Sequence, residues 1–454
     1  MTSTRRDIAG SWRRWETCDA VKSVPRGGIR QCAAVAAAPD IGVIAPYVCQ
    51  MTHSSLPRRV TRVALVAATV LFAVAATRPT ARALPLGNGL ALTPPMGWNS
   101  WNHFGCNVSS TLIRGVADAM AANGMREAGY QYVVIDDCWQ VGRDANGTVL
   151  ADSVRFPAGI KALADYVHSK GLKFGIYTDA GRTTCEGRVG SYEYEAQDMR
   201  TYAQWGVDYV KIDWCNSDGL DAPTQYAKLR DAITKSGRAI VFSICEWGQN
   251  RPWQWAPAAG HLWRTTGDIS DSWDSMLSNF DLSAQYWQIA KPGAWNDPDM
   301  LEIGNGGLNR EESRAHMSLW AIAAAPLIAG NDVRTMNDST RDARIARDVL
   351  LNRDVIAVNQ DSLGVQGHMI SNSRALLQVW SKPLKDGSMA VVMLNRATVP
   401  ARINADFVSM GMTSGSRRVR DLWAHKDTTV TGGGYAATVA PHGVMMFRAW
   451  PAAR

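Results

Sequence analysis

The sequence predicts an α/β fold, a (β/α)8 barrel (TIM barrel) followed by a C-terminal antiparallel β-sandwich domain. Eight short apolar runs alternate with helix-like stretches over roughly 250 residues, the usual length of such a barrel. Acidic residues stand where most of these runs end, and the carboxyl ends of barrel strands meet at one face. Beyond about residue 366 the helical spacing gives way to alternating strand-like runs separated by turn signals.

The barrel prediction depends on the order of strand-like and helix-like segments. The candidate strands are 96–101, 132–137, 174–179, 209–213, 240–244, 262–266, 294–297 and 327–329. Apolar residues recur at helical spacing in 112–128, 160–170 and 195–205, and more weakly in 222–236. An open, doubly wound sheet is the alternative. No glycine-rich phosphate-binding turn follows any of the strands, which favours the barrel.

Acidic residues at the strand ends predict where the active site lies. They are Asp136, Asp137, Asp179, Asp213, Glu246, Asp268, Asp297 and Asp299. A single carboxylate in such a place is more often a helix cap than a catalytic group. Six of the eight candidate strands end in this way, which capping does not explain. We therefore expect the acids to gather at one face of the barrel.

The C-terminal part predicts a small β domain without catalytic groups. A helix-like stretch at 340–358 precedes it, and strand-like runs follow at 375–380, 389–394, 401–405, 418–422 and 443–449. Turn signals at 385–387 and 432–434 separate some of these runs. We place the catalytic barrel at 84–362 and the β domain at 363–454.

The first 83 residues predict a leader and not part of either domain. Basic residues at 58–62 precede an apolar run at 63–76, and Ala81-Arg82-Ala83 is a typical signal-peptidase site. A membrane-spanning helix needs roughly 20 apolar residues, more than this run offers. We expect an upstream extension at 1–50, a start at Met51, cleavage before Leu84 and a secreted enzyme.

Charge gives no support for a nucleic-acid or membrane partner. The whole chain carries a net charge of +7, from 48 Lys and Arg and 41 Asp and Glu. Residues 1–83 hold 12 of the basic and 4 of the acidic residues, so the remainder carries a net charge of −1. The basic character therefore belongs to the leader and not to the predicted domains.

Asp213 and Asp268 are the candidate catalytic pair. Glycoside hydrolysis with retention needs two carboxyl groups, roughly 5–5.5 Å apart, on either side of the scissile bond. Each aspartate closes a predicted barrel strand, and the two strands are two positions apart in the predicted order. Lys211 alternates with Asp213 on the same strand and points to the same side. It either holds Asp213 ionised and binds sugar hydroxyls, or forms a purely structural Lys–Asp pair.

Seven sequence blocks resemble glycoside hydrolase family 27, the α-galactosidase (melibiase) and α-N-acetylgalactosaminidase group. They are Met-Gly-Trp-Asn-Ser-Trp at 96–101, Ile-Asp-Asp-Cys-Trp at 135–139, Gly-Ile-Tyr-Thr-Asp at 175–179, Lys-Ile-Asp at 211–213, Cys-Glu-Trp at 245–247, Arg-Thr-Thr-Gly-Asp at 264–268 and Trp-Asn-Asp-Pro-Asp-Met-Leu at 295–301. The blocks follow the family's order, and the resemblance covers about 91–454.

The resemblance implies hydrolysis of terminal α-D-galactosyl groups by double displacement, without a metal or organic cofactor. It implies that Asp213 is the nucleophile and Asp268 the acid/base. The implied substrate-binding residues are Trp101 near C6 of the galactose, Asp136 and Asp137 at the 4- and 6-hydroxyls, Lys211 at the 3- and 4-hydroxyls, Arg264 near the 2-hydroxyl, and Tyr177 and Asp299. The substrate would be a galacto-oligosaccharide or a galactomannan side chain.

Sugar specificity is expected to depend on Glu246. The resemblance places it at the 2-substituent of the sugar, where a carboxylate accepts from a hydroxyl and crowds an N-acetyl group. The short side chain of Asp136 leaves room for the C6 hydroxymethyl group. The alternatives are an α-N-acetylgalactosaminidase, a β-L-arabinopyranosidase, or a non-catalytic carbohydrate-binding protein on the same scaffold. A degenerate relative would usually lose Asp213, Asp268 or Lys211, and all three are present, which disfavours the last alternative.

The cysteines and two further acids complete the predictions. The resemblance implies the disulfides Cys106–Cys138 and Cys185–Cys215, and leaves Cys245 as a buried free thiol. No cysteine or histidine cluster has the spacing of a zinc site. Asp271 and Asp274 lie close to Asp268 but stand at a predicted helix start, where acids favour the helix dipole. We interpret both as structural.

Overall fold

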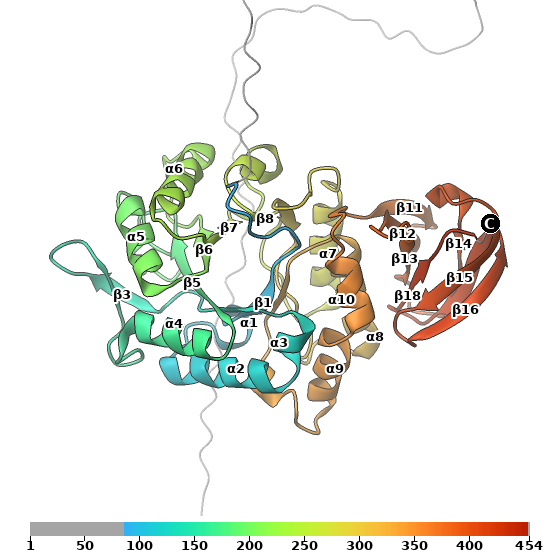
Figure 1. Ribbon diagram of the computed structural model, residues 1–454, viewed down its shortest axis with the longest axis horizontal. Helices are drawn as coiled ribbons and strands as arrows, with labels where there is room; N and C mark the ends of the chain where they lie inside the picture. Colours follow the sequence, from blue (N-terminus) through green and yellow to red (C-terminus); the bar gives the residue numbers. More distant parts are fainter. Residues whose placement is uncertain (1–85, 453–454) are drawn as a thin grey trace, which may run out of the picture. The chain divides into compact units, whose positions relative to one another are not determined.

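The computed structural model describes residues 86–452, and their core is a barrel of eight parallel strands (Figure 1). The strands are β1 (Met96–Asn99), β2 (Tyr132–Val134), β5 (Lys173–Asp179), β6 (Tyr209–Asp213), β7 (Val241–Cys245), β8 (Leu262–Arg264), β9 (Trp295–Asp297) and β10 (Leu327–Ala329). Their order is β10-β1-β2-β5-β6-β7-β8-β9. A parallel bridge between Leu301, four residues beyond the end of β9, and Ala329 of β10 closes the barrel. The predicted fold class is confirmed.

Helices lie around the outside of the strands (Figure 1). They are α1 (Trp101–Phe104), α2 (Ser110–Ala122), α3 (Met125–Ala128), α4 (Gly159–Ser169), α5 (Glu195–Trp205), α6 (Ala222–Lys235), α7 (Trp273–Ala284), α8 (Arg310–Ile322), α9 (Arg341–Leu350) and α10 (Arg353–Asn359). The predicted helix 112–128 is divided at Gly124, whose φ of 94° no regular helix adopts. The predicted helix 340–358 is divided before Asn352, whose side chain caps α10.

Two features of the barrel were not predicted. A hairpin, β3 (Gln140–Arg143) and β4 (Val149–Ala151), is inserted between β2 and α4. Between β7 and β8 the chain forms only two 3-10 turns, η1 (Pro252–Gln254) and η2 (Ala256–Ala258), in place of a helix. Within residues 86–452, none of the helices combines the length and the apolar character that a membrane span requires.

Side chains along β6 alternate between the outer helices and the barrel interior. Val210 and Ile212 belong to the large apolar cluster that the surrounding helices share. Tyr209 belongs to a separate cluster of strand residues, which fills one end of the barrel. Lys211 and Asp213 lie on the same side of the strand as Tyr209. The alternation therefore places both polar residues inside the barrel, with Asp213 at its carboxyl end.

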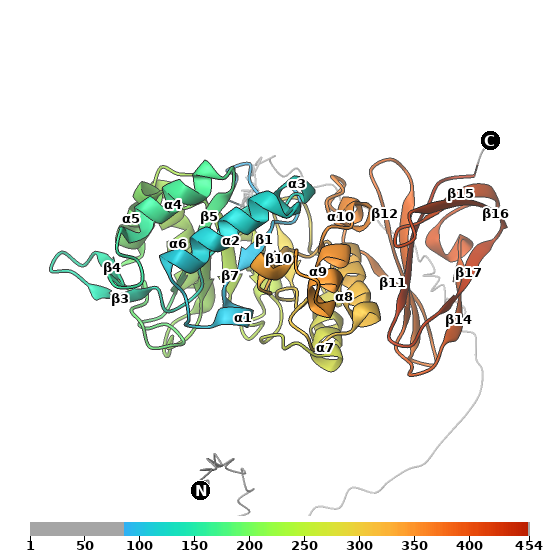
Figure 2. The same cartoon turned by 90° about the horizontal axis from the view of Figure 1, so that it is seen from below.

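The C-terminal domain consists of two antiparallel sheets (Figure 2). Its strands are β11 (His368–Ser373), β12 (Leu377–Pro383), β13 (Met389–Asn395), β14 (Ala401–Asp406), β15 (Gly415–Asp421), β16 (Lys426–Gly432), β17 (Gly434–Val439) and β18 (Val444–Ala449). The larger sheet has the order β11-β12-β13-β18-β15-β16, and β14 pairs with β17. Apolar side chains from both sheets, such as Val391 and Ile403, form one core. This confirms the predicted β-sandwich.

The two domains share one apolar cluster and are also joined by polar and aromatic contacts. Arg396 of the β domain forms an ion pair with Asp281 of α7, at 2.5 Å. The ring of His442 stacks on Trp273 at 4.5 Å between centroids, and its Nδ1 lies 2.9 Å from the carboxylate of Glu312. Trp273 begins the helix that follows the Asp268 loop. The β domain therefore packs against the start of that helix.

Candidate active site

A cavity of about 620 Å³ opens at the carboxyl ends of the barrel strands. Nine predicted site residues line it: Trp101, Asp136, Asp137, Tyr177, Lys211, Asp213, Arg264, Asp268 and Asp299. They come from six different strands or the loops that follow them. The barrel therefore brings together residues that are up to 198 positions apart in the sequence. Among the predicted site residues, Glu246 does not line this cavity.

Asp213 lies deep in the cavity and is only 5% exposed. Its Oδ2 accepts a hydrogen bond from the Tyr177 hydroxyl at 3.0 Å, and its Oδ1 accepts one from the Trp214 amide at 3.0 Å. Burial raises the pKa of Asp213 to about 6, although Lys211 acts in the opposite direction. We expected Lys211 to hold this carboxyl ionised. Lys211 acts in the expected direction, because it lowers the pKa of Asp213, but the effect of burial is larger.

Lys211 makes its direct ion pair with Asp136, at 2.9 Å. The same Oδ2 of Asp136 also accepts from the side-chain amide of Asn99 at 2.7 Å. Lys211 thus bridges two strands at the base of the cavity. Of the two roles that the sequence left open for this lysine, the structural pair exists, but its partner is Asp136 and not Asp213.

Asp137 is also engaged with protein donors. One carboxylate oxygen accepts from the Cys138 amide at 2.6 Å, and the other accepts from the Glu186 amide at 3.1 Å. Burial raises the pKa of Asp137, against the effect of these hydrogen bonds. A carboxylate oxygen can accept more than one hydrogen bond, so Asp137 retains capacity for sugar hydroxyls.

Arg264 forms ion pairs with two acids of the cavity wall, Asp268 and Asp299. It lies 3.0 Å from Asp268 and 3.0 Å from Asp299. Partial burial raises the pKa of Asp268, but the nearby positive charges of Arg264 and Lys211 have the larger, opposite effect. The pKa of Asp268 is therefore below its ordinary value. The side chain of Asp268 is 69% exposed. Asp268 therefore lies at the cavity mouth, whereas Asp213 lies at its base.

Asp299 holds two neighbouring parts of the site in place. It adopts a φ of 88°, which is rare for any residue other than glycine. In this conformation its Oδ2 accepts from the amide of Ile269 at 2.8 Å, while its other oxygen pairs with Arg264. One side chain thus holds both the arginine and the loop that carries Asp268.

The predicted position of Glu246 is wrong. Its side chain is fully buried, and both oxygens are occupied by its own loop: Oε1 by the amide of Gly248 at 3.1 Å, and Oε2 by the amide of Asn250 at 2.7 Å. The next residue, Trp247, adopts a φ of 59° and lines the cavity instead. Strand alternation does not continue through such a turn, so spacing alone could not identify Trp247. The glycine that follows it was the available signal for a turn.

The comparisons with known proteins agree with this geometry. The model of the family described as alpha galactosidase A matches residues 93–361, and that of the alpha galactosidase C-terminal beta sandwich domain matches residues 375–449. The chain belongs to glycoside hydrolase family 27, the α-galactosidase family. This membership makes it a glycosidase of the α-galactosidase class.

Individual relatives cover most of the chain. It is 54% identical to alpha-galactosidase A of Cellvibrio japonicus over 68% of this chain and 77% of that protein. It is 49% identical to an alpha-galactosidase of Oryza sativa subsp. japonica over 81% of this chain and 87% of that protein. The solved structure of an α-galactosidase from Saccharomyces cerevisiae with raffinose is similar with a TM-score of 0.75 and 28% identity, over 81% of this chain and all of that one.

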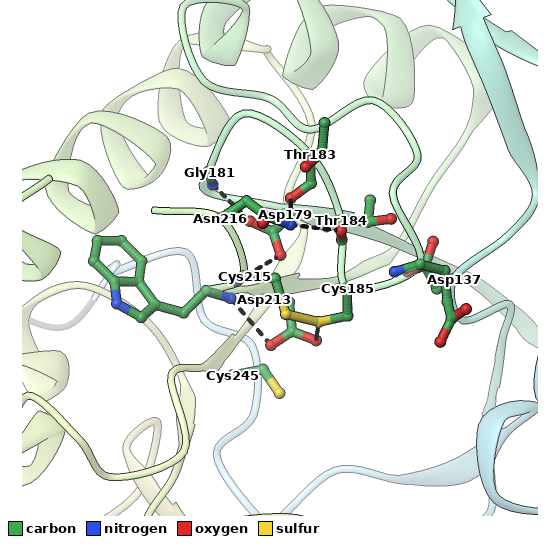
Figure 3. The surroundings of a disulfide bond; sticks show 12 residues. Asp137, Asp179, Gly181, Thr183, Thr184, Cys185, Asp213, Cys215, Asn216 and Cys245 are labelled. Carbon is green, nitrogen blue, oxygen red and sulfur yellow. Dashed lines mark hydrogen bonds between the residues drawn. A yellow bond between two sulfur atoms is a disulfide. The ribbon is translucent and has the colours of Figure 1, made fainter. Parts of the chain in front are cut away.

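The enzyme's disulfide between Cys185 and Cys215 lies directly beside Asp213, as Figure 3 shows. Cys185 Sγ is 3.5 Å from Asp213 Oδ2. Asp179, at the end of β5, holds the same region by accepting from the Gly181 amide at 2.6 Å and the Cys215 amide at 2.9 Å. Burial and the nearby Asp213 raise the pKa of Asp179 to about 9.

The remaining cysteines and acids are arranged largely as expected. Cys106 and Cys138 form the second disulfide, and Cys245 is a buried free thiol. Asp274 lies in the first turn of α7. Asp271 precedes that helix, accepts from the amides of Gly307 and Leu308, and also lines the cavity. Asp271 therefore stabilises the loop at Gly307 and Leu308 and forms part of the cavity wall.

In the described part of the enzyme, two groups of side chains hold potential metal-ligand atoms close enough together to bind an ion. One contains Cys185 and Cys215 with two aspartates, and the other contains Cys106 and Cys138 with Glu186. In both groups the cysteines are joined in disulfides, so they offer no thiolate ligand. Neither group fits the donor set of a zinc site.

Removing the Cys185–Cys215 disulfide should reduce both stability and activity. In the variant Cys185→Ala/Cys215→Ala we expect the free energy of unfolding to fall by about 3 kcal/mol, the typical effect for a loop of this length. We also expect kcat to fall, because the loop beside Asp213 loses its tether. Denaturant unfolding and steady-state kinetics measure the two effects.

The other disulfide provides a matched control. Cys106–Cys138 spans 32 residues, against 30 for Cys185–Cys215, so the loss of stability should be similar. An equal loss of kcat in the Cys106→Ala/Cys138→Ala variant would contradict a specific role beside Asp213.

Proposed function

We propose that the enzyme hydrolyses terminal non-reducing α-D-galactosyl groups of galacto-oligosaccharides or galactomannan side chains, with retention, through a covalent galactosyl-Asp213 intermediate. The observation that carries this proposal is that Asp213 and Asp268 line one cavity, the first at its base and the second at its mouth. A sugar between them meets a nucleophile on one side and an acid on the other.

In the first step the Asp213 carboxylate attacks the anomeric carbon, and the bond from that carbon to the leaving oxygen breaks. Asp268 gives its proton to the leaving oxygen. In the second step Asp268 takes a proton from water, and the water oxygen replaces Asp213 at the anomeric carbon. Every atom comes from the enzyme, the sugar and water, so the proposal needs no metal or organic cofactor.

The sugar hydroxyls are bound by groups that the barrel holds in place. Asp136 is fixed by Lys211 and Asn99, so its carboxylate cannot rotate freely to meet the 4- and 6-hydroxyls. Rigid acceptors bind a hydroxyl at a lower entropic cost than mobile ones. Trp101 offers an indole for the apolar side of the galactose around C6.

We assign to Trp247, in place of Glu246, the discrimination between a hydroxyl and an N-acetyl group at C2 of the sugar. Trp247 lines the same cavity as Arg264, the residue implied at the 2-hydroxyl. An indole in this wall takes the space that an N-acetyl group would need. Galactose, with a free 2-hydroxyl, is therefore preferred over N-acetylgalactosamine.

A panel of nitrophenyl glycosides tests the sugar specificity. The panel contains the α-galactoside, the α-N-acetylgalactosaminide and the β-L-arabinopyranoside, assayed alongside raffinose and galactomannan. We expect the α-galactoside to give the highest kcat/KM. A higher value for either of the other glycosides would overturn the assignment.

The pH dependence of kcat/KM should be bell-shaped, with an alkaline limb near pH 6. The reaction needs one proton on the two carboxyls, held by Asp268. Such a singly protonated pair exists between the two pKa values, about 6 for Asp213 and a value below the ordinary one for Asp268. These pKa values place the single proton mainly on Asp213, so the reacting form, with the proton on Asp268, is the minor one of two forms that share the same pH range. Activity therefore falls as the pH rises through about 6, because the shared proton is lost. Rates from about pH 3 to about pH 8 test this, and undiminished activity up to pH 8 would contradict it.

We also propose that the enzyme is secreted after cleavage before Leu84, with 1–83 as an upstream extension and signal peptide. These residues lie outside those that the structure describes. The proposal is supported by the basic and apolar pattern at 58–76 and by the two disulfides of the barrel, which suit an oxidising compartment. N-terminal sequencing of the natural product should give Leu84 or a close neighbour. Recovery of residues 1–50 would refute it.

A further inference from the structure

The residues implied in galactose binding line only part of the cavity. The rest of its wall includes Asn102, His103, Ser270, Asp271, Glu302 and Asn305, which we call the outer lobe. Resting on the proposed function, we propose that the outer lobe binds the sugar unit to which the galactosyl group is attached, the leaving group of the first step. This sugar is a polyhydroxylated pyranose and not an aromatic group.

The position of the acid/base places the leaving sugar on this side. The carboxyl of Asp268 must lie beside the glycosidic oxygen, and the leaving sugar begins at that oxygen. Asp213 closes the base of the cavity, so the leaving sugar extends outward past Asp268. The chain that follows Asp268 continues along the outer lobe through Ser270 and Asp271. The lobe is thus the continuous wall that the leaving sugar meets first.

A buried carboxylate holds the outer lobe in shape. Glu302 is 3% exposed and accepts hydrogen bonds from the side-chain amides of Asn102 and Asn305. The oxygen of Asn305 in turn lies 3.0 Å from Nδ1 of His103. This network links α1, which follows β1, to the loop after β9. The hydrogen-bonding groups of the lobe are therefore pre-organised before a sugar arrives.

The outer lobe offers polar atoms that the protein leaves available. Within residues 86–452, Nε2 of His103 and Oδ1 of Asn102 have no hydrogen-bond partner. The hydroxyl of Ser270 contacts only that of Ser272, at 3.5 Å. Imidazole, amide and hydroxyl groups are donors and acceptors for sugar hydroxyls. A nitrophenyl leaving group has no hydroxyl with which to use them.

The test compares two substrates that share the galactosyl group and differ in the leaving group. They are raffinose, in which a sugar carries the galactosyl group, and 4-nitrophenyl α-D-galactoside. In His103→Ala we expect kcat/KM for raffinose to fall about fivefold, the effect of losing one hydrogen bond. The value for the nitrophenyl substrate should stay within about twofold, because the proposal places His103 beside the leaving sugar and not beside the galactosyl group. His103 is exposed, so the substitution should leave the fold intact.

A neighbouring cleft provides the control variant. It has a volume of about 580 Å³, is lined by residues 214–220, Gln249 and Asn250, and lies next to the cavity through Trp247 and Cys185. Gln249→Ala should leave both substrates unchanged. Ser270→Ala serves as a second test of the lobe, with the same expected direction as His103→Ala.

Three results would overturn the proposal. They are unchanged raffinose hydrolysis in both lobe variants, equal losses for both substrates, or a raffinose-specific loss in Gln249→Ala. The proposed mechanism is tested separately, because the ratio of the two substrates does not depend on which carboxylate attacks the sugar. The inhibition constant of free galactose should not change in any of these variants, since galactose occupies the inner part of the cavity.

Discussion

Asp213→Asn should lower kcat on 4-nitrophenyl α-D-galactoside by on the order of 10⁴-fold, the scale typical of removing a nucleophile. Asparagine keeps the size of the side chain and can still accept a hydrogen bond from Tyr177, so the cavity should keep its shape. The amide oxygen is a far weaker nucleophile than a carboxylate, so the galactosyl ester does not form. Steady-state kinetics measures the loss, and calorimetry should still detect galactose binding.

The control for this variant is Asp274→Asn. Asp274 is an exposed acid in the first turn of α7 and does not line the cavity. Its substitution should leave kcat within about twofold, since it removes only a favourable helix-dipole contact. More than about 1% residual kcat in Asp213→Asn would show that Asp213 is not the nucleophile, because that loss is far smaller than removal of a nucleophile causes.

Asp268→Ala should have an effect that depends on the leaving group. Raffinose has a poor leaving group that needs a proton, so its kcat/KM should fall about 10²–10⁴-fold. Nitrophenolate leaves without a proton, so formation of the intermediate from the nitrophenyl substrate should slow much less. Single-turnover kinetics of the two substrates measures this difference.

Equal losses for the two substrates would contradict the acid role of Asp268. They would indicate instead that Asp268 acts by positioning the cavity wall through its ion pair with Arg264. Asp268→Asn separates these possibilities further. The amide can still hydrogen bond in the wall but cannot transfer the proton that raffinose requires.

Much of the fold follows from local patterns. The apolar residues of all eight barrel strands, and the acids at the carboxyl ends of six of them, were visible in the sequence, because buried parallel strands form short apolar runs. The strands β11, β16 and β17 were missed. Most residues of β16 are exposed, so its sequence carries no alternation of apolar and polar residues. The β3–β4 hairpin was missed for a similar reason, since β3 contains Gly142 and only two of its four residues are apolar or buried.

The site shows where local patterns are insufficient. The gathering of Asp136, Lys211 and Asp213 follows from strand alternation and barrel closure. The finding that Trp247 and not Glu246 lines the cavity does not follow from these patterns. It depends on the backbone angle φ of Trp247, just after β7. The pKa of Asp213 also depends on burial, which only the folded barrel creates.

The most direct test of the proposed double displacement is the configuration of the first product. Proton NMR of a reaction in progress distinguishes α-galactose from β-galactose before the two interconvert. Attack by Asp213, followed by attack of water on the same carbon, inverts the anomeric centre twice and releases α-galactose. Release of β-galactose first would mean a single displacement and would exclude the galactosyl-Asp213 intermediate.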